Sequence, residues 1–145
     1  HQEMTRFLIS LDSAVDTVFA ALQFGNKGET FIPNVPAARV VDIAEALIKS
    51  QGKQLSINFT GVRPGEKLHE ILVSEEERHR TTERKGYYVI CPVVPELREI
   101  ELGKPPITSE YSSENITLNV DSLCELLAPH ISAITSSESL PDLTR

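Results

Sequence analysis

The sequence predicts an α/β fold of one globular domain: the alternation of elements indicates the class, and the composition indicates the globular domain. In the first half of the chain, stretches with apolar residues at helical spacing alternate with short apolar stretches bounded by glycine and proline. The composition is that of an ordinary globular protein, with 40% hydrophobic and 24% charged residues among 145. This length suffices for one modest core and is too short for two full domains. The predicted strands are few and short, so we expect an appendage of a larger sheet and not a complete doubly wound fold.

The first predicted elements are an extended segment, a helix and a strand. Residues 4–10 are predicted to be extended, and Ser10 can cap a helix that ends at Gly25. The apolar residues of this helix recur at helical spacing, and Asp12 lies in its first turn, where the helix dipole favours a carboxylate. Residues 30–32 are then predicted to form a short buried strand.

A second helix follows a loop that contains two prolines. Its apolar stripe begins at Val40, and the helix is predicted to stop near Gly52. Residues 55–59 alternate apolar and polar side chains, which predicts a strand. Residues 75–85 mix both charges and are interpreted as a solvated face or a mobile loop. Residues 87–91 read as one more strand.

The last third is predicted to be mostly loop. Prolines punctuate residues 92–106. A short helix is expected over residues 120–127, capped by Asn119 and halted before Pro129. Residues 130–145 are rich in serine and poor in apolar side chains, so we expect a disordered tail.

Charge and composition exclude several classes of function. A net charge of -7 argues against binding to nucleic acid or to anionic membrane surfaces. No apolar run approaches the roughly 20 residues that span a bilayer, and no export signal is recognisable, so a cytoplasmic location is expected. Cys91 and Cys124 are then expected to be reduced thiols. Histidines and glutamates between positions 69 and 79 fit no standard ligand spacing, so no metal is expected.

The strongest local motif is residues 63–66, Arg-Pro-Gly-Glu, which are predicted to lie between a strand and a helix. Pro64 keeps Arg63 extended, and Gly65 permits a sharp turn and the close approach of a ligand. The helix start favours a phosphate. Arg63 can bind a diphosphate through two parallel hydrogen bonds, and Glu66 can accept from vicinal hydroxyls such as those of ribose. The alternative is a solvated turn with a helix-capping glutamate, and the pattern alone favours it, because short motifs often match by chance.

Arg6 is the second candidate. A long cation between apolar residues either reaches solvent or faces an anion, and taken alone the first interpretation is favoured. Two arginines on one diphosphate would balance its charge, so the pairing of Arg6 with Arg63 is the sharper hypothesis. The sequence contains no Gly-x-Gly-x-x-Gly fingerprint and no Tyr-x-x-x-Lys pair. From its residues alone, the chain offers an anion-binding turn and no catalytic machinery.

Several segments resemble one known family. Residues 4–7 (MTRF), 31–36 (FIPNVP) and 61–70 (GVRPGEKLHE) are similar, in this order and spacing, to the CapD-like polysaccharide-biosynthesis group of extended short-chain dehydrogenases. This group includes inverting UDP-N-acetylglucosamine 4,6-dehydratases and UDP-glucose 4-epimerases. Residues 111–115 and 123–127 are similar to the end of its capsule-synthesis branch.

The resemblance implies the fold and the site. It implies a small substrate-binding domain of an extended short-chain dehydrogenase/reductase over residues 1–129, lacking the Rossmann domain. It also implies that Arg6 and Arg63 contact the diphosphate of UDP and that Glu66 contacts the nucleotide. In the parent enzyme, NADP or NAD would take hydride from C4 of the sugar; water then leaves across C5 and C6 and hydride returns to C6, or hydride simply returns to C4.

The residues of that chemistry belong, in the family, to a part that this sequence does not contain. The resemblance therefore implies no catalytic residue, no bound cofactor and no turnover for this chain alone. Three functions stay open: a fragment of a UDP-N-acetylglucosamine 4,6-dehydratase/5-epimerase type enzyme, a 4-epimerase fragment, or a non-catalytic binding or assembly module. The expected partner is a UDP-sugar, and the parent is expected to be a homo-oligomer.

Overall fold

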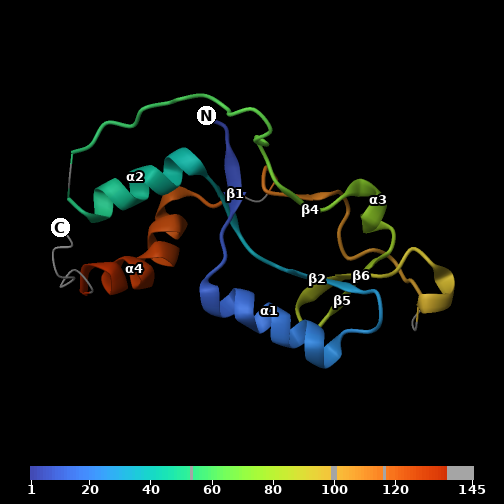
Figure 1. The fold of residues 1–145 in the computed structure, drawn as a ribbon. Coiled ribbons are helices and arrows are strands. Elements are labelled where there is room, and N and C mark those ends of the chain that lie inside the picture. Colours follow the sequence, from blue (N-terminus) through green and yellow to red (C-terminus); the bar gives the residue numbers. More distant parts are fainter. Residues whose placement is uncertain (53, 99–100, 116, 137–145) are drawn as a thin grey trace, which may run out of the picture.

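The structure, a computed structural model, describes residues 1–52, 54–98, 101–115 and 117–136. Helices and short strands alternate along the chain, which confirms the mixed helix–strand composition (Figure 1). In chain order the elements are β1 (Thr5–Phe7), α1 (Leu11–Phe24), β2 (Thr30–Pro33), β3 (Ala37–Arg39), α2 (Val40–Ser50), β4 (Ile71–Val73), α3 (Glu75–Arg78), β5 (Thr81–Arg84), β6 (Tyr87–Ile90), the 3-10 turn η1 (Pro95–Leu97), β7 (Tyr111–Ser112) and α4 (Val120–Ser136).

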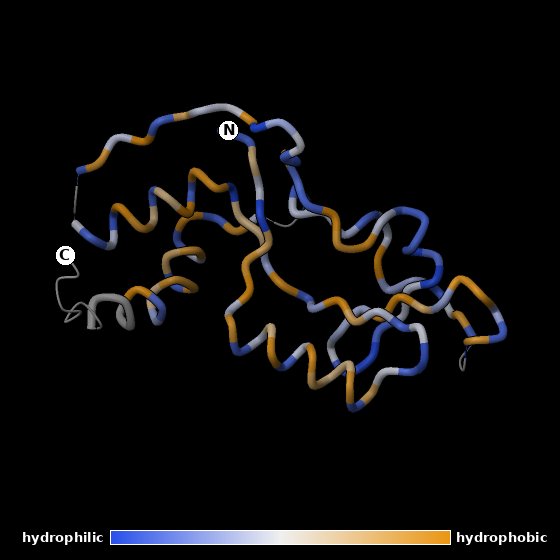
Figure 2. Tube along the Cα trace, in the orientation of Figure 1, coloured by the Kyte–Doolittle hydropathy of each residue, from blue (hydrophilic) through white to orange (hydrophobic). Residues whose placement is uncertain are grey.

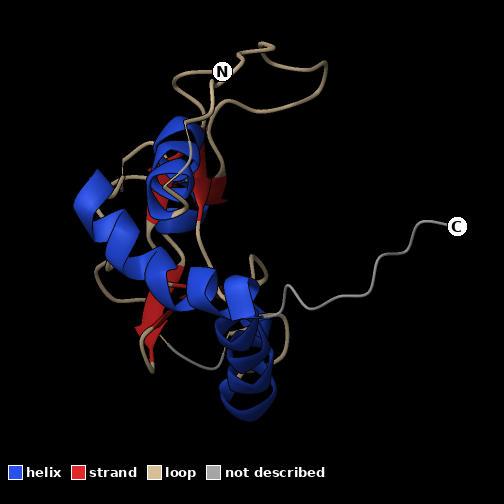
Figure 3. Ribbon diagram, turned by 90° about the vertical axis from the view of Figure 1, so that its left-hand side faces the viewer, coloured by secondary structure: helices blue, strands red, loops and turns tan. Residues whose placement is uncertain are grey.

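The described strands form three small antiparallel sheets, β1–β3, β2–β6–β5 and β4–β7. Helices α2 and α4 pack on each other, and α1 lies along β2 (Figures 1 and 3). The buried side chains gather in two small clusters. One contains Ile32, Val73, Ile90 and Tyr111, and the other contains Ala38, Ala46 and Leu123.

Helix α1 begins and ends as the sequence predicts. The Ser10 hydroxyl accepts a hydrogen bond from the Ser13 amide at 3.1 Å, which satisfies one free N–H of the first turn. The Gly25 amide donates to the Ala21 carbonyl at 3.0 Å. A Cβ atom at residue 25 would lie 2.4 Å from that carbonyl oxygen, so only glycine fits there.

The apolar stripe that predicted α1 is largely exposed, although apolar residues recur along the helix (Figure 2). Leu11 is 81% exposed and Leu22 is 77% exposed, whereas Ala20 is the residue that the helix buries. Helical spacing therefore identified the helix correctly without identifying its packed face.

Residues 75–85 form a helical turn and a strand, so the mobile-loop interpretation is wrong, whereas their charged side chains are exposed or half-buried, as the solvated-face interpretation predicts. Ser74 and Glu77 form a capping box at α3, in which each side chain bonds the other residue's amide. Strand β5 then pairs with β6 through a turn at Lys85 and Gly86, whose φ angles are 55° and 83°. This geometry is that of the tight hairpin turns that match the twist of their strands.

Three other predictions of secondary structure are wrong. Residues 55–59 form no strand; they lie in an extended arm (Figure 1), where Leu55 is 62% exposed. No helix follows Glu66. Helix α4 continues through Pro129 to Ser136, so part of the predicted tail is helical, and residues 137–145 lie outside the described residues. The short strand β3 was not predicted.

Candidate functional site

Arg6 attaches β1 to the loop that carries the Arg-Pro-Gly-Glu motif. Its guanidinium donates to the carbonyl oxygens of Thr5 at 2.7 Å, Lys67 at 3.0 Å and Leu68 at 3.3 Å. Its side chain is 27% exposed, and it lies 3.7 Å from a carboxylate oxygen of Glu66 and 3.7 Å from one of Glu70. Arg6 thus faces anionic and carbonyl oxygens, as the second of its two interpretations predicts, but these oxygens belong to the protein.

The motif itself forms a closed turn. The Glu66 amide donates to the Arg63 carbonyl at 3.0 Å, and the Glu66 carboxylate accepts from the Arg63 amide at 3.1 Å. Gly65 has φ of 81°, a conformation that glycine adopts without strain. Because no helix follows, the predicted phosphate site at a helix start does not exist. The alternative is confirmed in part: residues 63–66 form an exposed turn, but Glu66 closes that turn and caps no helix.

The structure brings two of the three predicted site residues into contact. Arg6 and Glu66 meet across 3.7 Å, although 60 positions separate them in sequence. Arg63 lies in the same turn with an exposed side chain, and among the described residues its guanidinium has no hydrogen-bond or ion-pair partner. The Glu66 carboxylate therefore contacts both the Arg6 guanidinium and the Arg63 backbone amide. The predicted two-arginine grip on a diphosphate stays a prediction.

Sequence reasoning missed the buried hydroxyls beside this loop. Thr5 and Ser113 are 3% and 0% exposed, and their hydroxyl oxygens are 2.7 Å apart. The Thr5 hydroxyl also lies 2.8 Å from Nδ1 of His69, and the Ser113 hydroxyl accepts from the Glu70 amide at 2.9 Å. No spacing rule connects His69 to residues 5 and 113, so the sequence predicts no contact among them.

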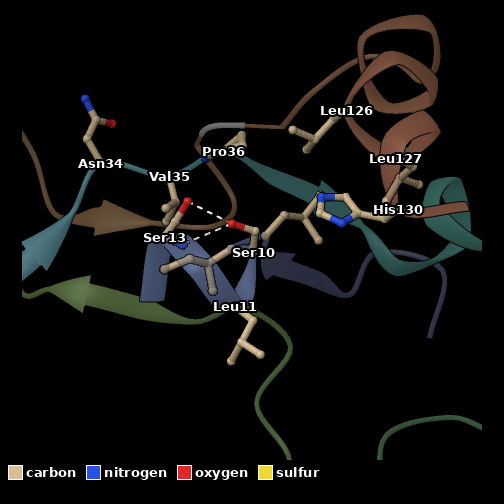
Figure 4. Close-up of a pocket in the computed structure, with 11 residues that line it drawn as sticks. Ser10, Leu11, Ser13, Asn34, Val35, Pro36, Leu126, Leu127 and His130 are labelled. Atoms are coloured by element: carbon tan, nitrogen blue, oxygen red, sulfur yellow. Dashed lines mark hydrogen bonds between the residues drawn. The ribbon is translucent and has the colours of Figure 1, made fainter. Parts of the chain in front are cut away.

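A pocket lies away from the arginine turn. It has a volume of about 550 Å³ and opens between the start of α1, the loop before β3 and helix α4 (Figure 4). Its lining includes Ser10, Leu11, Val35, Leu127 and His130. The described pocket therefore does not contain the three predicted site residues, Arg6, Arg63 and Glu66.

The histidines and acidic residues do not gather into a metal site in the described part of the chain, where no three such side chains could share an ion. Within the same residues, no helix is both long enough and apolar enough to cross a membrane. Both cysteines are free thiols; Cys91 is buried and Cys124 half-buried.

These features define a small mixed helix–strand domain with an arginine-bearing turn held against its first strand. The chain belongs to the polysaccharide biosynthesis protein family, whose model matches residues 1–92.

Similar proteins agree with this membership. Over 91 residues, the chain is 42% identical to a UDP-N-acetylglucosamine 4,6-dehydratase (inverting) of Campylobacter jejuni; the match covers 63% of this chain and 26% of that protein. Over 133 residues, it is 37% identical to a UDP-glucose 4-epimerase of Rickettsia prowazekii, covering 86% of this chain and 38% of that protein. The X-ray structure of Pen from Bacillus thuringiensis superposes with a TM-score of 0.75 at 25% identity, over 89% of this chain and 39% of Pen. The chain thus spans well under half the length of each.

Proposed function

We propose that this chain is the substrate-binding part of an enzyme that modifies a UDP-linked sugar in capsular or surface polysaccharide biosynthesis. The proposed type is the UDP-N-acetylglucosamine 4,6-dehydratase/5-epimerase. The names of its relatives support this type. The observation that carries the proposal is the contact of Arg6 with the turn of Arg63 and Glu66, because it brings two arginine residues and a carboxylate acceptor to one surface.

Each of the three residues has a role in the proposal. Arg63 binds the diphosphate through its free guanidinium, which offers paired N–H donors to phosphate oxygens. Arg6 supplies a second positive charge to the same group. Glu66 keeps lone pairs beyond the one that the Arg63 amide uses, and these accept from the ribose hydroxyls.

The described residues do not fit the dinucleotide cofactor of the proposed parent enzyme. A dinucleotide binds where a glycine-rich turn joins a parallel strand to a helix, whereas the strands described here pair antiparallel. We therefore assign NADP or NAD, and every residue of the hydride and proton chemistry, to other polypeptide of the parent. This chain's residues bind and orient the nucleotide.

A 4-epimerase parent is the second candidate. The Rickettsia epimerase aligns over 86% of this chain, whereas the Campylobacter dehydratase aligns over 63%. The two parents would give different products from the same UDP-sugar. A dehydratase product is lighter by one water and an epimerase product has unchanged mass, so mass spectrometry distinguishes them.

Titration with UDP, followed by NMR, tests the nucleotide site. We expect weak binding to this chain. Arg63→Ala should weaken that binding by about 10- to 100-fold, since it removes charge-assisted hydrogen bonds worth roughly 1.5–3 kcal/mol. Lys49→Ala is the matched control, because it removes an exposed charge on α2 and should leave the affinity unchanged. Equal affinity of the wild-type chain and Arg63→Ala, or no binding to the wild-type chain at millimolar UDP, would contradict the proposal.

A further inference from the structure

A chain of buried hydrogen bonds lies behind the proposed nucleotide site. It joins three separate segments, through Thr5 on β1, His69 in the loop before β4 and Ser113 directly after β7. The hydroxyls of Thr5 and Ser113 are within 2.7 Å, and Thr5 is within 2.8 Å of Nδ1 of His69. Both hydroxyl residues are buried, so each hydrogen needs an acceptor inside the protein.

The donors and acceptors fix the direction of this chain. The Ser113 oxygen accepts from the Glu70 amide at 2.9 Å, and in the described residues it bonds otherwise only to Thr5. The Ser113 hydrogen therefore points to Thr5. The Thr5 hydrogen then points to His69, whose Nδ1 is an acceptor. The hydrogen of a neutral His69 consequently lies on Nε2, which is 3.9 Å from a carboxylate oxygen of Glu114.

The same short segment of β1 also holds the loop from its other side. The Thr5 amide donates to the Leu68 carbonyl at 3.0 Å, and Arg6 donates to the carbonyls of Lys67 and Leu68. Successive side chains of a strand point to opposite faces, so Thr5 holds the loop from within while Arg6 holds it at the surface. The loop therefore has a defined position relative to Arg6 at residues 67 and 68, directly after the turn of residues 63–66.

We propose that Thr5, His69 and Ser113 are positioning residues for the nucleoside diphosphate. They hold the loop so that Arg63 and Glu66 stand beside Arg6, and they do not touch the ligand. This inference rests on the proposed UDP site, and it names the buried residues that hold that site in place. A grip formed by residues about 60 positions apart needs such support, because a misplacement of about 1 Å weakens bidentate hydrogen bonds severely.

A mutant cycle measures this role through UDP affinity. Thr5→Val keeps the shape of the side chain and removes its hydroxyl, whereas Thr5→Ser keeps the hydroxyl. We expect Thr5→Val to weaken UDP binding about tenfold and Thr5→Ser to bind within about twofold of wild type. In an Arg63→Ala background, Thr5→Val should weaken UDP binding by a clearly smaller factor than in the wild-type chain, because only Glu66 is then left to position. If Thr5 acted independently of Arg63, the fold losses in UDP affinity of the two single variants would multiply in the double variant.

A second measurement needs no variant. At a pH of about 8.5, well above the usual histidine range, the imidazole ¹⁵N shifts of the wild-type chain should show the hydrogen of His69 on Nε2. A hydrogen on Nδ1 would overturn the assigned direction. Binding that depends on Arg63 but not on Thr5 would overturn the positioning role alone. No UDP binding by the wild-type chain would overturn the proposed function and the positioning role with it.

Discussion

Glu29 and Arg84 form a buried ion pair that joins the end of α1 to the β5–β6 hairpin. The Glu29 side chain is 3% exposed, and both of its oxygens accept from Arg84, at 2.6 and 2.8 Å. The Asn26 amide donates to the same carboxylate at 2.8 Å. Glu29→Gln removes the charge with little change of shape and turns an amide NH₂ group toward the guanidinium.

The expected loss is large for a domain of this size. Removing one partner of a buried pair costs about 3–5 kcal/mol, since the other charge stays buried without compensation. Arg84 keeps its hydrogen bond to the Phe24 carbonyl at 2.8 Å, and its side chain is 21% exposed. We therefore expect the lower end, about 3 kcal/mol, out of a total stability of about 5–15 kcal/mol.

The same pair predicts how stability depends on pH. Burial raises the pKa of Glu29, but the hydrogen bonds from Arg84 and Asn26 outweigh it and hold the pKa below its ordinary value of 4.5. A lowered folded pKa stabilises the folded state above the unfolded value, and this contribution is lost as the pH falls through the folded value. The stability difference between wild type and Glu29→Gln should therefore be constant near neutral pH and shrink below about pH 4.5.

Urea unfolding followed by circular dichroism, repeated between about pH 3.5 and pH 7, measures this difference. Glu75→Gln is the control, because it breaks a pair of the same chemistry at a carboxylate that is 58% exposed, and it should change stability little. The reasoning is refuted if Glu29→Gln costs no more than Glu75→Gln, or if the difference grows as the pH falls.

Two further predictions concern buried polar groups. The Tyr111 hydroxyl accepts from the Val35 amide at 2.9 Å and donates to the Val35 carbonyl at 2.8 Å, so Tyr111→Phe should lower the free energy of unfolding by about 1–3 kcal/mol, measured by urea titration; an unchanged midpoint would contradict this. Burial raises the pKa of the Cys91 thiol, so we expect Cys91 to react with a thiol reagent on the order of tenfold more slowly than Cys124 at neutral pH; equal rates in the folded chain would contradict it.

Local signals explain most of what the sequence predicted correctly. Helix α1 follows from Ser10, Gly25 and the spacing between them, because capping and helical periodicity act over a few residues. The capping box of Ser74 and Glu77 also has a local sequence signature, but the prediction for this segment used only its mixed charges. Residues 55–59 alternate correctly for a strand, yet a strand forms only with a partner, and the partner cannot be read from the segment itself.

In the candidate site too, the locally determined part was predictable and the part that depends on long-range contacts was not. The turn of residues 63–66 was recognisable from Pro64 and Gly65, which act on the backbone next to them. The attachment of that turn to Arg6 depends on long-range contacts with carbonyl oxygens, and any residue supplies a carbonyl. The identity of residues 67 and 68 therefore does not reveal these contacts.

The bonds from Arg6 to the carbonyls of residues 67 and 68 bridge more than 60 positions, so they close a long loop of chain. Closing such a loop costs conformational entropy, which the contacts that it brings together must offset. A molecule that binds this surface only in the folded chain is linked to folding by mass action. It raises the melting temperature of the domain by an amount that grows with the logarithm of its concentration divided by its dissociation constant.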